Sequence, residues 1–284
     1  MKLAVSMWSY VRAVQSGDMN LIGFVQEAKS IGAFGVELLD FFYKDPVSER
    51  DSVKDELAAA GLPCPLFSVA NNFAKVSERD RAAQVDKIKF GVDEAAFFGA
   101  KTVRVFAGDL SEGLTYGQVF SWVVDGLSEA SDYARDRDVR LALENHGQLA
   151  GRGSQVCDIV QAVRDKSGHD ALGANPDTGN FLLVDQDSEE AVREVAQFAY
   201  MCHFKDFGAD GSGVFRSLQG NCFKGTVIGE GKVDLEGCVR ILTDSGFDGW
   251  FSLEYEGHGD PRKEVRISMD NARSIVAKVQ ESDD

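Results

Sequence analysis

Leu141-Ala-Leu-Glu144-Asn-His146 is an apolar run that ends on an acidic side chain, and three later segments have the same form. A short run rich in apolar residues is typical of a buried parallel strand. In each segment a side chain that can bind a metal stands at the C-terminal end of the run. The later segments are Leu172-Gly-Ala-Asn-Pro-Asp177, Tyr200-Met-Cys-His203-Phe-Lys205 and Trp250-Phe-Ser-Leu-Glu254.

Strand-like and helix-like segments alternate along all 284 residues. Several strands follow a helix end and a glycine, as in Ser30-Ile-Gly-Ala-Phe-Gly-Val-Glu37, which indicates repeated βα units. An open doubly wound sheet is the alternative, but eight units in one series favour closure. We therefore predict an α/β fold, a single (β/α)8 TIM barrel in one domain over residues 1–284. The predicted strands are Leu3–Trp8, Phe34–Leu39, Pro65–Ala70, Thr102–Ala107, Val139–Asn145, Leu172–Asp177, Tyr200–Lys205 and Trp250–Glu254, and the predicted helices cover 20–31, 48–60, 78–98, 115–137, 154–166, 188–198, 234–245 and 261–280.

The segment from Gly208 to Gly231 breaks this alternation, because it is long, rich in glycine and weakly patterned. Long loops inside compact domains are usually functional or disordered. It follows the seventh strand and leaves the rim where the candidate ligands gather. We predict a lid or substrate loop at 208–231, with a plain surface insertion as the alternative.

Composition narrows the class of partner. The formal net charge of -16 repels nucleic-acid phosphates and anionic lipids, so neither nucleic acid nor membrane is an expected partner.

The first apolar run is too short for a signal peptide, and no segment approaches the roughly 18 apolar residues of a membrane span. The five cysteines are scattered, which argues against a disulfide framework and a structural zinc site. We expect a cytoplasmic protein.

The four strand ends predict a metal site. In a closed barrel the C-terminal ends of the strands converge on one rim. Three carboxylates in one pocket repel one another unless a cation holds them. Taken singly, each side chain has an ordinary explanation, such as a salt bridge, a helix cap or a core hydrogen bond. Considered together, the four side chains predict a site for one divalent ion. Its ligands are Glu144, Asp177, His203 and Glu254, with Mn²⁺ favoured and Mg²⁺, Co²⁺ or Zn²⁺ as alternatives.

Five other side chains are secondary candidates. His146 is expected to contact substrate or act as a base, with a structural hydrogen bond as the alternative. Lys205 is expected to bind a substrate oxygen or stabilise an enolate, unless it forms a salt bridge. Arg216 is a candidate to bind a carboxylate or phosphate, or is a solvated loop residue. Trp8 is a packing residue or part of the pocket wall, and Glu37 makes a core hydrogen bond or points into the barrel mouth.

Several segments resemble the xylose isomerase-like TIM barrels, over essentially the whole chain. That group contains sugar (phosphate) isomerases and epimerases, inosose and dehydroshikimate dehydratases, and endonuclease IV nucleases. The resemblance implies that the four candidate ligands match the family's metal ligands, and that the two glutamates match the pair that moves the proton. The segments are Leu143-Glu144-Asn145-His146-Gly147, Pro176-Asp177-Thr-Gly-Asn180, His203-Phe-Lys205-Asp206, Ile228-Gly-Glu-Gly-Lys-Val-Asp234 and Gly246-Phe-Asp-Gly-Trp-Phe-Ser-Leu-Glu254.

The resemblance implies a metal-dependent isomerase or epimerase of a small sugar or sugar derivative, working through an enediolate. In the sugar epimerases a histidine commonly follows the metal aspartate by three residues, whereas this chain has Asn180, a candidate substrate ligand. The Glu-Asn-His form around Glu144 instead resembles the dehydratases, in which the histidine at the position of His146 serves as base. The alternative is therefore a metal-dependent dehydratase (a lyase) of a cyclic keto-polyol such as an inosose or dehydroshikimate.

Two further readings have less support. A repair nuclease of this fold assembles several zinc ions with more histidines than the four present here, and its DNA would be repelled by the net charge. A sugar-binding module without turnover would not need the two glutamates. The expected partner is a small carbohydrate-type molecule, and assembly into a homo-oligomer is left open.

Overall fold

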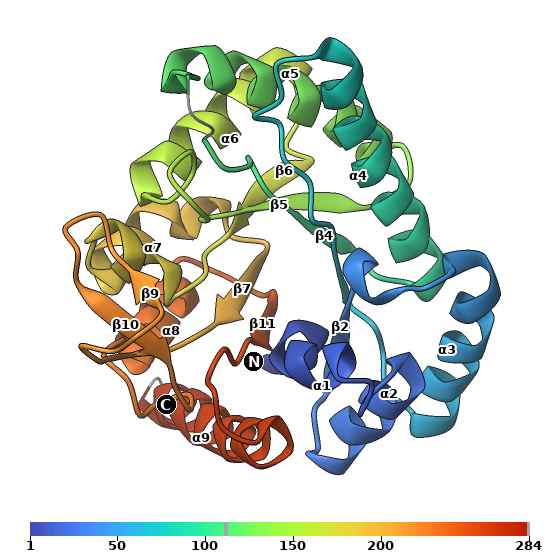
Figure 1. Ribbon diagram of the computed structural model, residues 1–284, viewed down its shortest axis with the longest axis vertical. Coiled ribbons are helices and arrows are strands. Elements are labelled where there is room, and N and C mark those ends of the chain that lie inside the picture. Colours follow the sequence, from blue (N-terminus) through green and yellow to red (C-terminus); the bar gives the residue numbers. More distant parts are fainter. Residues whose placement is uncertain (111–112, 283–284) are drawn as a thin grey trace.

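Eight parallel strands form one sheet that curls into a barrel, with helices on its outer side (Figure 1). The computed structural model describes residues 1–110 and 113–282. The order of neighbouring strands is β6-β5-β4-β3-β2-β1-β11-β7, which confirms the predicted (β/α)8 barrel. The strands are β1 (Lys2–Ser6), β2 (Gly35–Leu39), β3 (Leu66–Ser68), β4 (Thr102–Val105), β5 (Arg140–Glu144), β6 (Leu172–Asn175), β7 (Met201–Phe204) and β11 (Trp250–Leu253).

The barrel closes between β6 and β7 through isolated parallel bridges. Ala174 faces Ala199 in one bridge, and Asp177 faces His203 in the other. The His203 amide donates to the Pro176 carbonyl over 3.0 Å, just past the end of β6. Two of the four candidate ligands therefore face each other across the strand junction that completes the barrel.

The eight predicted helices lie within a few residues of their predicted positions, whereas the short α1 was not predicted, and local signals account for several ends. Thr115 and Gln118 form a capping box at the start of α5. Gly99 ends α4 in a left-handed conformation, with φ 81°, which glycine adopts without a steric cost. The helices are α1 (Val11–Gln15), α2 (Leu21–Ser30), α3 (Pro46–Ala60), α4 (Glu78–Phe98), α5 (Tyr116–Arg135), α6 (Gly153–Ser167), α7 (Ser188–Val195), α8 (Leu235–Asp244) and α9 (Pro261–Ser282). Among the described residues, none of these helices combines the length and the apolar character that crossing a bilayer requires.

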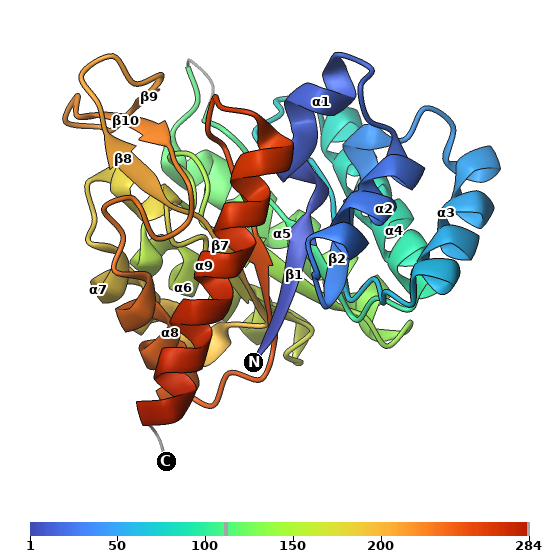
Figure 2. The ribbon, with the colours of Figure 1, turned by 90° about the horizontal axis from the view of Figure 1, so that it is seen from below.

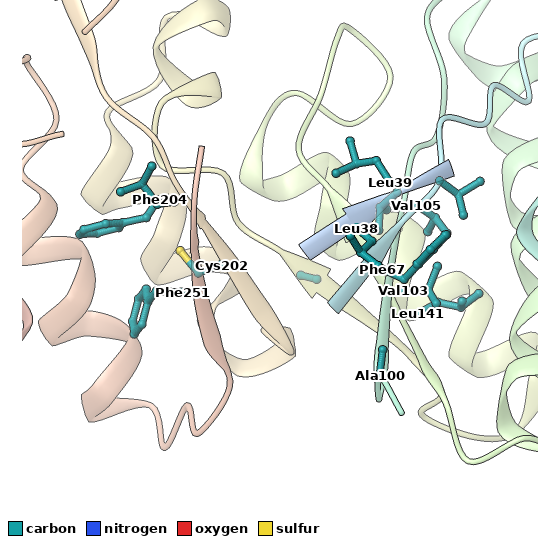
Figure 3. Packing of buried hydrophobic residues seen from close by; sticks show 14 of the residues in the cluster. Leu38, Leu39, Phe67, Ala100, Val103, Val105, Leu141, Cys202, Phe204 and Phe251 are labelled. Carbon is teal, nitrogen blue, oxygen red and sulfur yellow. The ribbon is translucent and has the colours of Figure 1, made fainter. Parts of the chain in front are cut away.

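The strands place their two faces in different surroundings. Side chains such as Leu38, Phe67, Val103 and Leu141 belong to the main apolar core (Figure 3). This core also includes buried side chains of the surrounding helices. The opposite faces carry a small second cluster, Ala4, Leu66, Ala142 and Met201. Polar residues follow two positions later on several of these strands, so the barrel interior turns polar toward the C-terminal ends of the strands.

Part of the predicted 208–231 loop folds into a small antiparallel sheet, β8 (Phe207–Ala209), β9 (Phe215–Arg216) and β10 (Cys222–Gly225). Figure 2 shows this sheet at the end of the barrel opposite the start of β1. A Cβ at Gly225 would lie 2.3 Å from the backbone of Glu256, so only glycine fits where β10 passes the chain after β11. The Asp206 carboxylate accepts hydrogen bonds from the amides of Gly229, Gly231 and Val233, and so holds the returning chain.

Candidate metal centre

Glu144, Asp177, His203 and Glu254 meet at one point in the barrel. Glu144 ends β5, Asp177 lies two residues past β6, His203 lies in β7 and Glu254 directly follows β11. All four side chains are buried, and each offers a ligand atom within 4.8 Å of the others. This convergence follows from the parallel sheet, because every contributing strand ends at the same rim.

The spacing of these atoms suits a single cation. His203 Nδ1 lies 3.2 Å from Glu144 Oε2, 3.3 Å from Glu254 Oε2 and 3.8 Å from Asp177 Oδ2. Neighbouring ligands about 2.1 Å from an octahedral ion are roughly 3 Å apart. Within the described chain, His203 Nδ1 is buried without a hydrogen-bond partner, and Asp177 Oδ2 and Glu254 Oε2 are buried beside one ammonium group, that of Lys205. Buried polar atoms with too few partners are costly, and a shared metal ion is what this donor set fits.

Amide side chains fix the backbone around the cluster. Asn145 Nδ2 donates to the Asp177 carbonyl over 3.0 Å, and Asn145 Oδ1 accepts from the Asp177 amide. Asn175 Oδ1 accepts from the His203 amide over 2.9 Å. Asp177 Oδ1 accepts from the amides of Gly179 and Asn180, each over 2.9 Å. Asp177 therefore makes an Asx turn with one oxygen and turns the other toward the cluster.

Lys205 is the counter-ion of the cluster. Its Nζ lies 2.9 Å from Asp177 Oδ2 and 2.8 Å from Glu254 Oε2. Burial would raise the pKa of Glu254, but Lys205 and His203 hold that pKa well below its usual value. Burial raises the pKa of Asp177 to about 7, against the opposing effect of Lys205. The negative charge gathered here exceeds what the buried lysine balances, which favours an additional cation.

A pocket of about 330 Å³ opens onto the cluster. Glu144 and Glu254 both line it, so the same two carboxylates face the metal position and the space for a ligand. Trp8, Phe41, Phe106 and Phe215 supply apolar walls. Aromatic side chains pack against the C–H groups of a bound ligand, while the polar groups of the pocket fix the orientation of that ligand.

Four predicted substrate or catalytic residues line this pocket, namely His146, Asn180, Lys205 and Trp8. Asn180 links Glu144 to Lys205. Its Nδ2 donates to Glu144 Oε1 over 3.1 Å, and its Oδ1 accepts from Lys205 Nζ over 3.3 Å. His146 is exposed at the rim, with its ring 4.7 Å from that of Phe106. Trp8 Nε1 donates to Glu256 Oε1 over 2.7 Å.

Arg216 is not among the residues that line this pocket, and its role as a substrate ligand stays a prediction. Its side chain is exposed, and Nη1 donates to Cys222 Sγ over 3.2 Å. The preceding residue, Phe215, lines the pocket instead. Successive residues of a strand point to opposite faces, so Phe215 inward leaves Arg216 outward.

Arg104 and Glu256 line the pocket and were not among the predicted residues. Arg104 is buried, with Nε 3.1 Å from Glu144 Oε2 and Nη1 donating to the Val69 carbonyl over 3.0 Å. Glu256 accepts the Trp8 hydrogen bond and lies 3.6 Å from Lys205 Nζ. A charged residue inside the apolar run Thr102-Val-Arg-Val105 is the sequence signal that would have identified Arg104.

The sequence and the fold of this chain are similar to those of known proteins. The family model of the xylose isomerase-like TIM barrel matches residues 25–275. The chain belongs to this family. A structure described as a D-tagatose 3-epimerase-like protein superposes with a TM-score of 0.80 at 18% identity, covering 100% of each chain.

Two curated relatives have different activities. L-ribulose-5-phosphate 3-epimerase UlaE of Escherichia coli O1:K1 / APEC is 23% identical over 95% of this chain and 94% of that protein. Inosose dehydratase of Clostridium botulinum (strain Eklund 17B / Type B) is 23% identical, but that match covers 46% of this chain and 45% of the relative. This family member is therefore similar both to an epimerase and to a dehydratase.

Proposed function

We propose that this protein is a divalent-metal-dependent enzyme that isomerises or epimerises a small sugar or sugar derivative, with Mn²⁺ as the first candidate ion. The observation that carries the proposal is the position of two buried carboxylates, Glu144 and Glu254, in both the four-residue cluster and the pocket wall. Two carboxylates, one as base and one as acid, can move a proton at a carbon beside a carbonyl. The epimerase relative, aligned over 95% of this chain, supports the same class.

The two glutamates would act in turn. One takes the proton from the carbon beside the substrate carbonyl, and the electron pair of the broken C–H bond forms the C=C bond of an enediolate. The opposite glutamate, in its acid form, delivers a proton to the other face or to the neighbouring carbon. A bound divalent ion would supply Lewis-acid polarisation of the carbonyl. Arg104 beside Glu144 and Lys205 beside Glu254 would hold the carboxylates in place.

A dehydratase is the second candidate, because His146 lines the pocket and is exposed at its rim. There it would take the proton beside the ketone of a cyclic polyol. The electron pair would form the new C=C bond as the β-hydroxyl leaves, protonated, as water. The partial match to inosose dehydratase supports this alternative.

One experiment separates the two reactions. The protein with added Mn²⁺ is incubated in deuterated buffer with a panel of ketoses, inososes and dehydroshikimate. Isomerisation or epimerisation gives a product of unchanged composition that carries deuterium at the labile carbon. Dehydration gives a product lighter by one water, with an enone that absorbs in the ultraviolet. If no member of the panel gives either product, both proposals are contradicted.

Substitution tests the assigned carboxylates. Glu144→Gln and Glu254→Gln keep the size of each side chain and remove its basicity, so each should lower turnover by at least about 10²- to 10⁴-fold. A double variant with full activity would end the proposal. His146→Ala should abolish dehydration and leave proton exchange by the two glutamates in place.

A further inference from the structure

Glu37 in β2 is a buried carboxylate to which the proposed reaction assigns no task. It is fully buried, as is its neighbour His203. Ser252 Oγ donates to Glu37 Oε2 over 2.5 Å, and Ser68 Oγ donates to Oε1. Glu37 Oε1 lies 3.1 Å from His203 Nε2. The carboxylate therefore ties together β2, β3, β7 and β11 inside the barrel.

The two nitrogens of His203 face different partners. Nε2 faces Glu37, whereas Nδ1 faces Glu144, Asp177 and Glu254. A carboxylate accepts hydrogen bonds only, so Nε2 carries the hydrogen in this pair. In the neutral ring that a metal ion would bind, the lone pair is then on Nδ1, which points to the three carboxylates. Partners on the far nitrogen of a metal-binding histidine set its tautomer and orientation in this way.

A role in packing alone does not account for this carboxylate. Burying a carboxylate costs several kcal/mol unless its partners compensate for lost hydration. Within the described residues no lysine or arginine nitrogen lies within 4.0 Å of Glu37, and its basic partner is the His203 ring. Both serines donate to it, which holds the two oxygens in a fixed orientation.

We propose that Glu37 is a positioning residue that sets the affinity of the centre for its divalent ion. By accepting from Nε2, it holds His203 with Nδ1 directed at the three carboxylates, so that the fourth ligand is oriented before the ion arrives. This inference rests on the metal centre of the proposed function, but it does not depend on which sugar reaction follows.

Glu37→Gln is the test, with Mn²⁺ alone as the probe. Glutamine keeps the volume and still accepts from a serine, but its amide presents either oxygen or nitrogen to the ring and no longer selects one tautomer. Titration of the full chain, with free Mn²⁺ measured by electron paramagnetic resonance, should give a Kd about 10- to 100-fold higher than that of the wild type. No turnover is needed for this readout.

Glu94→Gln is the matched control. Glu94 is a buried carboxylate of α4, paired with Arg50 over 3.2 Å and placed outside the four-residue cluster. The same chemical change there should lower the melting temperature and leave the Mn²⁺ Kd unchanged. An Mn²⁺ Kd for folded Glu37→Gln equal to that of the wild type overturns the inference.

A second variant covers failure of Glu37→Gln to fold. Ser68→Ala combined with Ser252→Ala keeps the carboxylate and removes both hydroxyls that orient it, so Mn²⁺ binding should weaken severalfold. Unchanged affinity in that variant overturns the inference. A wild-type chain that binds no Mn²⁺, Mg²⁺, Co²⁺ or Zn²⁺ overturns the proposed metal centre as well, which distinguishes the two failures.

Discussion

Lys205 is a buried ammonium held between carboxylates that are also candidate metal ligands. Its Nζ contacts Asp177 and Glu254 at 2.9 and 2.8 Å. Removing one partner of a buried ion pair leaves charge without compensation, which is far more costly than loss of an exposed pair. The lysine therefore stabilises the protein most when the metal ion is absent.

Lys205→Met should lower the free energy of unfolding of the metal-free protein by about 3–5 kcal/mol. Added Mn²⁺ replaces the missing positive charge, so the variant should gain more thermal stability from the ion than the wild type does. Differential scanning calorimetry with and without Mn²⁺ measures both effects. Lys224→Met removes an exposed pair with Asp210 and should change stability by at most about 1 kcal/mol. Equal losses in the two variants would contradict the argument.

The candidate ligands were predictable because each stands where an apolar run stops, and parallel strands share one rim. Glu37 and Arg104 were harder to assign, although both interrupt apolar strands. Their partners, His203 and Glu144, are distant in sequence, and strand periodicity does not tell which inward side chains touch across a barrel. Asn180 was singled out only as a departure from a family pattern, and its bridge between Glu144 and Lys205 depends on the turn at Asp177.

The small sheet β8-β10-β9 sets one wall of the pocket through Phe215. Its prediction as a loop on the functional rim had the correct place but missed the strands, because the segment is rich in glycine and has little alternation. Arg216 was considered as a ligand for a carboxylate or phosphate because it is the arginine of that loop. The direction of a side chain in a two-residue strand depends on how the hairpin is placed, which sequence pattern does not reveal.

Phe215→Ala should lower kcat/KM by about tenfold, mainly through KM, because it removes an apolar contact worth roughly 1.4 kcal/mol. Arg216→Ala is its neighbour on the outward face and should leave both constants unchanged. Steady-state kinetics on the substrate found by the deuterium panel measures the pair. A larger effect from Arg216→Ala would restore that residue to the pocket.

Helix α5 contains two glycines with opposite surroundings, and they offer a matched test of packing. A Cβ at Gly126 would lie 2.2 Å from the buried ring of Phe73, whereas a Cβ at Gly117 meets nothing within 4 Å. Gly126→Ala should lower the free energy of unfolding by about 1–3 kcal/mol through overpacking. Gly117→Ala should be neutral or stabilising by up to about 1 kcal/mol. Urea titration measures both, and a stabilised Gly126→Ala would contradict the close approach.

The barrel as a whole was predictable because the βα unit recurs eight times with glycines after helices. Closure itself depends on isolated bridges between β6 and β7, which lie beyond the run of regular pairing. Since Asp177 and His203 form one of those bridges, a bound ion would add a link across the junction.

Removal of the metal by a chelator should therefore lower the melting temperature of the whole protein. Saturation at about 100 times Kd contributes roughly 2.7 kcal/mol, which corresponds to a shift of roughly 4–5 °C for a chain of this size. Thermal unfolding followed by circular dichroism, before and after chelation, gives the value. Asp177→Asn should show little response to the same treatment, and a chelator-insensitive wild type would count against the centre.

The place of β11 in the sheet has a consequence for biosynthesis. This last strand lies between β1 and β7, and Glu254 follows it directly. A growing chain that ends before residue 250 lacks the strand that pairs with both β1 and β7, and it lacks Glu254, the fourth candidate ligand. Nascent fragments of this protein should accordingly stay open at that gap and unable to retain the ion, until residues 250–254 leave the ribosome.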